Sequence, residues 1–188
     1  AYLLSKKAHN NQYRGSGEEY FTHPLAVADY LAEMKLDSST IITALLHDVV
    51  EDTKVTIQNI NDEFGSEISR LVDGVTKLSK LDLKFGFAQA ENFRKLLLAS
   101  SDDIRVLLVK LADLLHNMRT IEFVKDKEKS IRKAKETMEI YAPLAERMGM
   151  NTIRDELEDL SFSVLNKPAR DLIIKRLQFI KNNNDHKR

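Results

Sequence analysis

Residues that break helices are scarce in this chain of 188 residues, which contains 6 glycines and 3 prolines. Glycine and proline mark most turns, so a sheet with many hairpins needs more of them than a set of long helices does. Apolar side chains also recur every three or four residues, which is the period of an α-helix. We therefore expect an all-α fold, with about nine to eleven helices in a single domain over residues 1–188.

Capping residues indicate where these helices begin and end. Asp37 precedes one predicted helix, Gly65 ends another, and Pro168 opens the last one. The polar stretch from Lys77 to Gly86 is typical of a mobile loop. The expected helices cover residues 25–34, 37–52, 56–64, 66–75, 87–99, 104–123, 128–147 and 151–165, and the segment from Pro168 onward.

The composition argues against several classes of protein. Lys and Arg number 29, as do Asp and Glu, so a net charge of zero gives no general attraction to nucleic acid. The chain has no cysteine, which excludes a disulfide framework or thiolate metal site and is compatible with the reducing cytoplasm. No apolar stretch approaches the roughly 20 residues of a membrane helix. No secretory leader precedes the first predicted helix, so we expect a cytoplasmic protein that does not enter a membrane.

Two of the predicted helices carry chemically reactive side chains opposite an apolar face. In the helix 37–52, the side chains of His47, Asp48, Glu51 and Asp52 lie away from its isoleucines, leucines and valines. In the helix 104–123, a polar stripe runs opposite the leucines and consists of Lys110, Asp113, Asn117 and Thr120. Each helix can therefore present ligands or catalytic groups while it packs.

The types of these residues suggest a metal centre. His23, the pair His47-Asp48 and the distant Asp113 offer imidazole nitrogens and carboxylate oxygens, which suit Mn²⁺, Fe²⁺ or Zn²⁺ better than Ca²⁺. An octahedral ion with these ligands keeps positions for a water and for a phosphate oxygen, so hydrolysis of a phosphate ester or anhydride is the natural chemistry. Acids beside the ligands could then transfer protons.

Structural explanations exist for the same residues. His23 stands before a proline and could simply hydrogen-bond at a helix entrance, and His47-Asp48 is a common dipeptide. A carboxylate at Asp113, inside an apolar run, is costly unless it is paired, and Lys110 one turn away could be its partner. Three further histidines have other expected roles: a satisfied core position or support behind the site for His116, a structural role for His9, and a place in the solvated tail for His186.

Longer segments around these residues resemble a known family. The order His23, His47-Asp48, Asp113 is that of the HD phosphohydrolase superfamily. The surrounding sequence resembles the hydrolase domain of the bifunctional RelA/SpoT alarmone enzymes over nearly the whole chain. The segments that carry this resemblance are YRGSGEEYFTHP (13–24), LLHDVVEDT (45–53), VDGVTKL (72–78), DIRVLLVKLADLLHNMRT (103–120) and ETMEIYAPLAERMG (136–149).

The resemblance implies a fold, an activity and a set of site residues. That family removes pyrophosphate from the ribose 3′ position of guanosine tetra- and pentaphosphate, (p)ppGpp, with a manganese ion, in a helical HD fold. Carried over by position, the resemblance implies the metal ligands His23, His47, Asp48 and Asp113, with Glu51 and Asp52 as catalytic acids. It also implies substrate contacts from Arg14, Ser16, Asn117 and Thr120, and Lys110 is expected to supply positive charge to the substrate.

This chain departs from the family pattern at two positions. Gly15 stands where many members carry lysine, which removes a cation beside the expected base, and Leu114 stands where members usually carry arginine. The expected metal and catalytic positions are all intact, which favours an active enzyme. Residues 136–188 resemble the helices that lead toward a synthetase domain in long members, so an attached or separate synthetase domain is a possible partner.

We therefore expect Mn²⁺-dependent hydrolysis of (p)ppGpp, releasing pyrophosphate and GDP or GTP in stringent-response control. One alternative is a catalytically silent nucleotide-binding regulatory domain, which would bind without turnover. Another is an HD phosphohydrolase that acts on a different nucleotide. This alternative stays open because Gly15 stands where many family members carry a lysine beside the base.

Overall fold

The structure is a computed structural model, and it describes residues 1–81, 89–99 and 102–185. Over these residues the chain is helical, and its only β-type pairing is an isolated bridge between Tyr13 and Glu19. The all-α prediction is therefore confirmed. The α-helices are α1 Tyr2–Ala8, α2 Thr22–Glu33, α3 Ser38–Leu46, α4 Val49–Asp52, α5 Ile57–Ser79, α6 Gln89–Ala99, α7 Arg105–Arg119, α8 Lys127–Glu136, α9 Ala142–Arg147, α10 Asn151–Leu165 and α11 Lys167–Asp185.

Several helix boundaries differ from the sequence prediction. The expected helix 37–52 is broken after Leu46, because a turn at His47 and Asp48 separates α3 from α4. Helix α5 continues to Ser79, so the first part of the predicted loop from Lys77 is helical, while residues 82–88 lie outside the described residues. The sequence did not predict α1, and a short π-helical turn replaces regular α-helix within 128–147.

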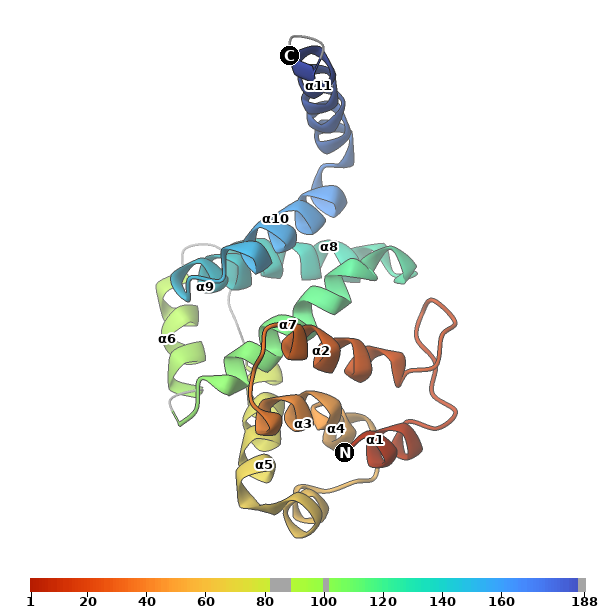
Figure 1. Cartoon of the computed structure of the whole chain (residues 1–188), viewed down its shortest axis with the longest axis vertical. Helices are drawn as coiled ribbons and strands as arrows, with labels where there is room; N and C mark the ends of the chain where they lie inside the picture. The colour runs from red at the N-terminus through yellow and green to blue at the C-terminus, as the bar shows by residue number, and fades with distance from the viewer. Residues whose placement is uncertain (82–88, 100–101, 186–188) are drawn as a thin grey trace.

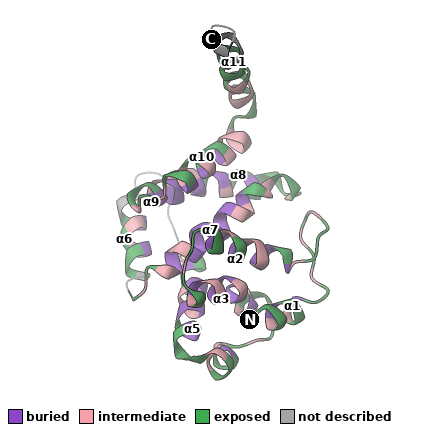
Figure 2. Ribbon diagram, in the orientation of Figure 1, coloured by how far each residue is buried: buried purple, intermediate pink, exposed green. Residues whose placement is uncertain are grey.

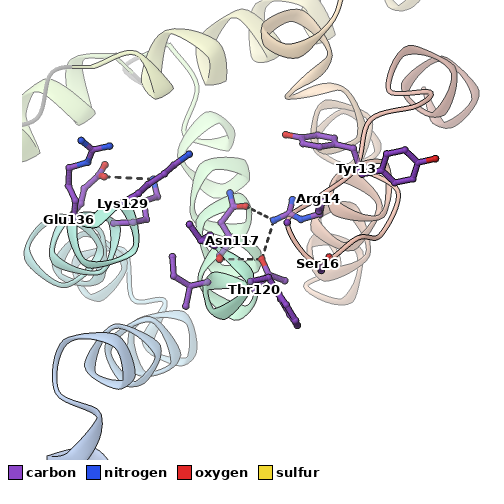
Figure 3. A pocket seen from close by; sticks show the side chains of 14 residues that line it. Tyr13, Arg14, Ser16, Asn117, Thr120, Lys129 and Glu136 are labelled. Atoms are coloured by element: carbon purple, nitrogen blue, oxygen red, sulfur yellow. Dashed lines mark hydrogen bonds and ion pairs between the residues drawn. The ribbon is translucent and has the colours of Figure 1, made fainter. Parts of the chain in front are cut away.

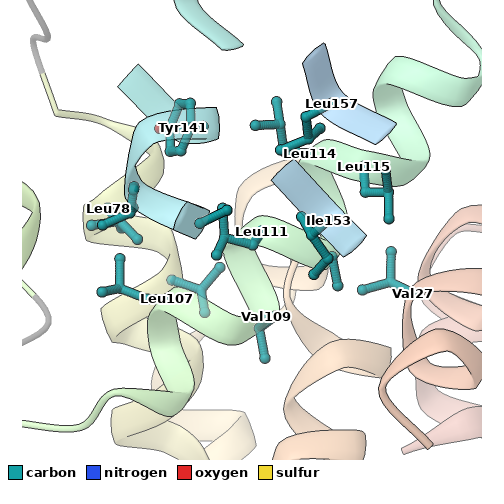
Figure 4. Packing of buried hydrophobic residues seen from close by; sticks show 14 of the residues in the cluster. Val27, Leu78, Leu107, Val109, Leu111, Leu114, Leu115, Tyr141, Ile153 and Leu157 are labelled. Atoms are coloured by element: carbon teal, nitrogen blue, oxygen red, sulfur yellow. The ribbon is translucent and has the colours of Figure 1, made fainter. Parts of the chain in front are cut away.

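Helix α7 is the centre of the packing. It packs against α2, α3, α5 and α10 (Figure 1). Most of its apolar side chains are buried, and those of Leu107, Leu111, Leu114 and Leu115 are in the main core, which Figure 4 shows. Each buried leucine of this kind contributes roughly 1.5–3 kcal/mol to folding. The packing therefore fixes the position of the polar side chains that α7 carries on its other face.

A smaller apolar cluster supports the turn between α3 and α4. It joins Leu46 and Val49, which flank that turn, to Ile60, Ile68 and Val72 of α5. Helix α5 changes direction at Gly65, whose φ of 86° lies in the left-handed region that glycine adopts most readily. The cluster and the kink together hold the turn at His47 and Asp48 close to α7.

Helix α11 differs from the other helices in its surroundings. It extends from the end of α10 away from the body of the molecule (Figure 1), and Figure 2 shows mainly exposed and intermediate residues along it. Several of its large apolar side chains are exposed, namely Leu172, Ile173, Leu177, Phe179 and Ile180. Among the described residues, no helix is both long enough and apolar enough to cross a membrane.

Candidate metal centre and adjoining pocket

Side chains from three parts of the chain converge beside α7. Helix α2 supplies His23, the α3–α4 turn supplies His47 and Asp48, and α7 supplies Asp113. The Nε2 atom of His23 lies 3.1 Å from Asp113 Oδ1 and 3.4 Å from Asp48 Oδ2. The Nε2 atom of His47 lies 3.2 Å from Asp48 Oδ2 and 3.7 Å from Asp113 Oδ1. The structure thus brings together all four residues that the sequence analysis predicted as metal ligands.

Hydrogen bonds on the far side of each imidazole orient the two histidines. His47 Nδ1 donates to the Ala44 carbonyl at 2.7 Å, which leaves Nε2 facing the cluster, buried and without a hydrogen-bond partner among the described residues. His23 Nδ1 is hydrogen-bonded to Nδ1 of His116 at 2.8 Å. Contacts of this kind fix the tautomer and direction of metal-binding histidines. The place of His116 agrees with the supporting role expected for it.

Asp113 is buried but has several partners. Lys110 Nζ donates to its Oδ2 at 2.9 Å and to Ser79 Oγ at 3.0 Å, and Asn117 Nδ2 donates to its Oδ1 at 2.6 Å. Burial raises the pKa of Asp113, but the charge of Lys110 and the neighbouring imidazoles of His23 and His47 outweigh burial, so its pKa is low and it stays ionised. Lys110 is therefore a buried partner of Asp113, the structural alternative left open by the sequence.

Burial and neighbouring charges shift the pKa values of two of these histidines in opposite directions. Burial lowers the pKa of His47, yet the charges of Asp48 and Asp113 hold it above its ordinary range. Burial, together with His23 and Arg14, lowers the pKa of His116 to about 4, so His116 is neutral near pH 7. The acids attract positive charge into the space between the rings.

These donors fit a divalent cation. One ligand atom from each of His23, His47 and Asp113 lies within 4.8 Å of the others, and the Asp48 carboxylate adjoins both imidazoles. A mixed set of imidazole nitrogens and carboxylate oxygens suits Mn²⁺, Fe²⁺ or Zn²⁺. Nε2 of His47 has no hydrogen-bond partner among the described residues, and a cation that replaces its proton would bond this atom.

The predicted catalytic acids lie on α4, next to the cluster. Both side chains are exposed. Asp52 Oδ2 accepts a hydrogen bond of 2.9 Å from the Tyr20 hydroxyl, which also donates to Asp48 Oδ2 at 2.9 Å. Burial and the charge of Asp48 raise the pKa of Glu51 above its usual range. A carboxyl group with a raised pKa is suited to accept and return a proton near neutral pH.

A cavity of about 500 Å³ opens beside this cluster (Figure 3). Arg14 extends from the loop before α2 into the cavity wall, where it donates to Asn117 Oδ1 at 2.9 Å and to Thr120 Oγ1 at 3.1 Å. Ser16 also lines the cavity and donates to Glu18 at 3.2 Å. Because Asn117 also bonds Asp113, a continuous polar face of α7 connects the cavity with the histidine–aspartate cluster.

The opposite wall of the cavity was not predicted from the sequence. It is lined by Lys129, Arg132 and Lys133 of α8 and by Glu136, which pairs with Lys133 at 3.7 Å. Arg132 and Lys133 follow Lys129 by three and four residues, so the three cations share one helix face. This spacing could have predicted a basic surface from the sequence. The chain has no net charge, but this wall carries local positive charge.

The structure gives a physical reason for both departures from the family pattern. A Cβ atom on Gly15 would lie 2.8 Å from the Phe123 carbonyl oxygen, closer than such contacts allow, so this loop packs too tightly for a side chain there. Leu114 is fully buried among the core residues of α7. Leucine is therefore stabilising at a position where an unpaired arginine would be costly.

Known proteins that are similar to this chain include HD-domain proteins. The family model described as "HD domain" matches residues 1–151. The chain belongs to the HD domain family. The GTP pyrophosphokinase rsh of Brucella ovis is 56% identical over 178 residues, which is 94% of this chain and 24% of the relative. The bifunctional (p)ppGpp synthase/hydrolase SpoT of Escherichia coli K12 is 52% identical over 178 residues, 94% of this chain and 25% of the relative.

These matches confirm the predicted resemblance to RelA/SpoT proteins. The HD chain spans about a quarter of the length of the curated relatives it matches. A solved structure described as a metazoan ortholog of SpoT that hydrolyses ppGpp superimposes with a TM-score of 0.59 at 22% identity, over 85% of this chain and 90% of that one. At that identity the likeness concerns the fold, and it supports the helical HD architecture.

Proposed function

We propose that this HD domain hydrolyses (p)ppGpp at the ribose 3′ position and releases pyrophosphate with GDP or GTP. One observation carries the proposal: Asn117 on α7 bonds both Arg14 in the cavity wall and Asp113 in the histidine–aspartate cluster. A nucleotide in the cavity can therefore place a phosphate at a metal centre on the same helix. The printed names of SpoT and of the metazoan ortholog support this choice of substrate.

In this proposal the cluster holds one Mn²⁺ ion through His23, His47, Asp48 and Asp113. When bound, the ion neutralises phosphate charge and lowers the pKa of a water. Lys110 keeps Asp113 ionised, and the contacts to Ala44 and His116 keep the two imidazoles in place.

The two acids on α4 activate and orient the attacking water in the proposed reaction. Glu51, with its raised pKa, accepts a proton from the attacking water, and Asp52 orients that water from the side facing Tyr20. The attack breaks the bond between the phosphorus and the ribose 3′ oxygen, which takes the proton from Glu51 and leaves as a hydroxyl group. The pyrophosphate product carries several negative charges, which Glu51 and Asp52 would repel once ionised. Their position at the exposed side of the cluster therefore also favours release of the product.

The cavity binds the nucleotide in two parts under this proposal. Arg14, Ser16, Asn117 and Thr120 contact the guanosine, and the cations Lys129, Arg132 and Lys133 hold its 5′ phosphates. A guanidinium that is already fixed by two hydrogen bonds loses little freedom when a base packs on it. The negative ligand thus meets local positive charge on a protein of zero net charge.

The relatives suggest a wider setting for this activity. They are about four times longer than the aligned segment, so we propose that a synthetase domain accompanies this HD domain, on the same chain or as a separate partner. We also propose that the reaction serves the stringent response in the cytoplasm, where its nucleotide substrates are made.

The test is turnover by the purified, metal-stripped chain. Guanosine tetraphosphate is incubated with and without Mn²⁺, and pyrophosphate and GDP are separated by anion-exchange chromatography. We expect Mn²⁺-dependent release that disappears in Asp48→Ala. Binding without turnover by the Mn²⁺-loaded chain would favour a regulatory nucleotide-binding domain instead. Turnover of another nucleotide, but not of guanosine tetraphosphate, would favour an HD phosphohydrolase with a different substrate.

A further inference from the structure

A closed ring of contacts lies behind the acid Asp52. Tyr20 donates to the Asp52 carboxylate at 2.9 Å, and the Tyr20 ring stacks on His9 with ring centroids 4.8 Å apart. His9 Nδ1 donates to Gln12 Oε1 at 2.8 Å, and Gln12 Nε2 donates to the Asp52 carbonyl at 2.9 Å. These four residues come from the end of α1, the loop that follows it, and α4, and each one contacts the next.

We propose that Tyr20 is a positioning residue, which acts through Asp52 and holds its carboxylate at the edge of the metal centre. The proposal rests on the proposed function for its catalytic consequence, whereas the ring itself is visible in the contacts.

Asp52 needs such support because of where it lies. Helix α4 has four residues, and a helix this short is not stable without contacts to the rest of the protein. The Asp52 side chain is exposed, so its carboxylate would otherwise rotate freely in solvent. Tyr20 binds the side chain and Gln12 binds the backbone of the same residue, which fixes both.

The chemistry of the phenol suits this role. Tyr20 is half-buried, and a phenol keeps its proton near neutral pH, so its hydroxyl can donate to a carboxylate. That single proton can be donated to one carboxylate at a time, although both Oδ2 atoms lie 2.9 Å away. Once Asp48 serves as a metal ligand, Asp52 is the acceptor that remains.

His9 gives the ring its rigidity. It is buried at the end of α1, with 2% of its surface exposed, and its side chain contacts both Tyr20 and Gln12. A stacked ring restricts the torsion of the Tyr20 phenol and so lowers the entropy cost of its bond to Asp52. The end of helix α1 is thereby coupled to Asp52, the acid proposed to orient the attacking water.

The first test is a double-mutant cycle on stability, measured by urea unfolding with Mn²⁺ present, so that Asp48 is engaged as a metal ligand and Asp52 is the acceptor for Tyr20. Tyr20→Phe keeps the stacked ring and removes the hydroxyl, and Asp52→Ala removes its acceptor. We expect the two changes to be coupled, so that Tyr20→Phe alters the unfolding equilibrium constant roughly tenfold less when Asp52 is absent. Additive changes would overturn the contact. Tyr2→Phe, which removes the hydroxyl of an exposed tyrosine on α1, is the matched control and should change little.

The second test is the same cycle on the reaction. We expect Tyr20→Phe to lower kcat roughly tenfold and to change KM less than about twofold, with no further loss in the Asp52→Ala background. A structural defect alone would give additive losses, and this result would overturn the positioning role. A wild-type chain without turnover would instead contradict the proposed function, while the stability cycle would still decide the contact between Tyr20 and Asp52.

Discussion

Lys110 and Asp113 form an ion pair one turn apart on α7, and both side chains are at most 10% exposed. Removing one member of a buried pair leaves an uncompensated charge, so we expect Lys110→Met to lower the free energy of unfolding by about 3 kcal/mol. Urea unfolding of the metal-free chain measures this. Lys77→Met, which removes an exposed pair with Asp73, should cost less than about 1 kcal/mol. Equal effects of the two substitutions would contradict the buried pairing.

Individual site residues differed in how visible they were in the sequence. Asp113 stood out because a carboxylate inside an apolar helical run is unusual, and the structure places it beside His23 and His47. The contact between Tyr20 and Asp52 could not be predicted, because it depends on how the loop before α2 folds back over α4. The roles of the predicted ligands and acids stay predictions until they are tested by substitution.

Among the helices, the start of α7 is tied to its neighbours by one arginine. Arg105 bonds Asp103 on its own segment, Asp37 at the start of α3, and Glu67 on α5. The hydrogen bond from Arg105 is the main reason that the pKa of Asp103 is lowered. The unfolded chain therefore binds this proton more readily than the folded chain, and stability is lost as pH falls through the acidic range.

Arg105→Gln tests this pH dependence. We expect the variant to be less stable than the wild type at pH 7, and the difference to shrink as pH falls toward 3, because protonation of the acids weakens their pairing with Arg105 in the wild type. Urea unfolding at the two pH values measures the free energies. A difference that stays constant between pH 7 and pH 3 would show that Arg105 contributes by packing rather than by its ion pairs.

The helices themselves were mostly predictable, since apolar periodicity and capping residues depend on local sequence. Asp37 caps α3 through the Thr40 amide, and a kink occurs at Gly65 where an ending was expected. The break at His47 and Asp48 was missed, because the periodic pattern continues across it while tertiary packing turns the chain there. The π-helical turn at Thr137–Tyr141 has no sequence signal that we could identify.

For the molecule as a whole, α11 is the part that should matter least to the site. It packs against α10 and leaves large apolar side chains in solvent, so it buries little surface against the body. We expect a chain that ends after Asn166 to keep its Tm within about 2 °C of the full chain. Thermal unfolding followed by circular dichroism measures this. A fall of more than about 5 °C would show that α11 stabilises the body directly.

The overall charge and the local charge of the molecule lead to different expectations. A net charge of zero argues against a general attraction to polyanions, and the sequence could establish that much. The gathering of Lys129, Arg132 and Lys133 opposite Arg14 depends on the placement of α8 across the cavity, which only the fold provides. Composition therefore excluded a broad class of ligand without excluding a small, highly charged one.

The central claim of a divalent metal centre is tested most directly by titrating Mn²⁺ into the metal-stripped chain by calorimetry. We predict one ion per chain, with binding lost in His47→Ala and unchanged in Glu63→Ala, which alters an exposed acid on α5. Two results would contradict the assignment of a metal centre to His23, His47, Asp48 and Asp113. One is a wild-type protein that binds no Mn²⁺, and the other is a His47→Ala variant that binds Mn²⁺ as the wild type does.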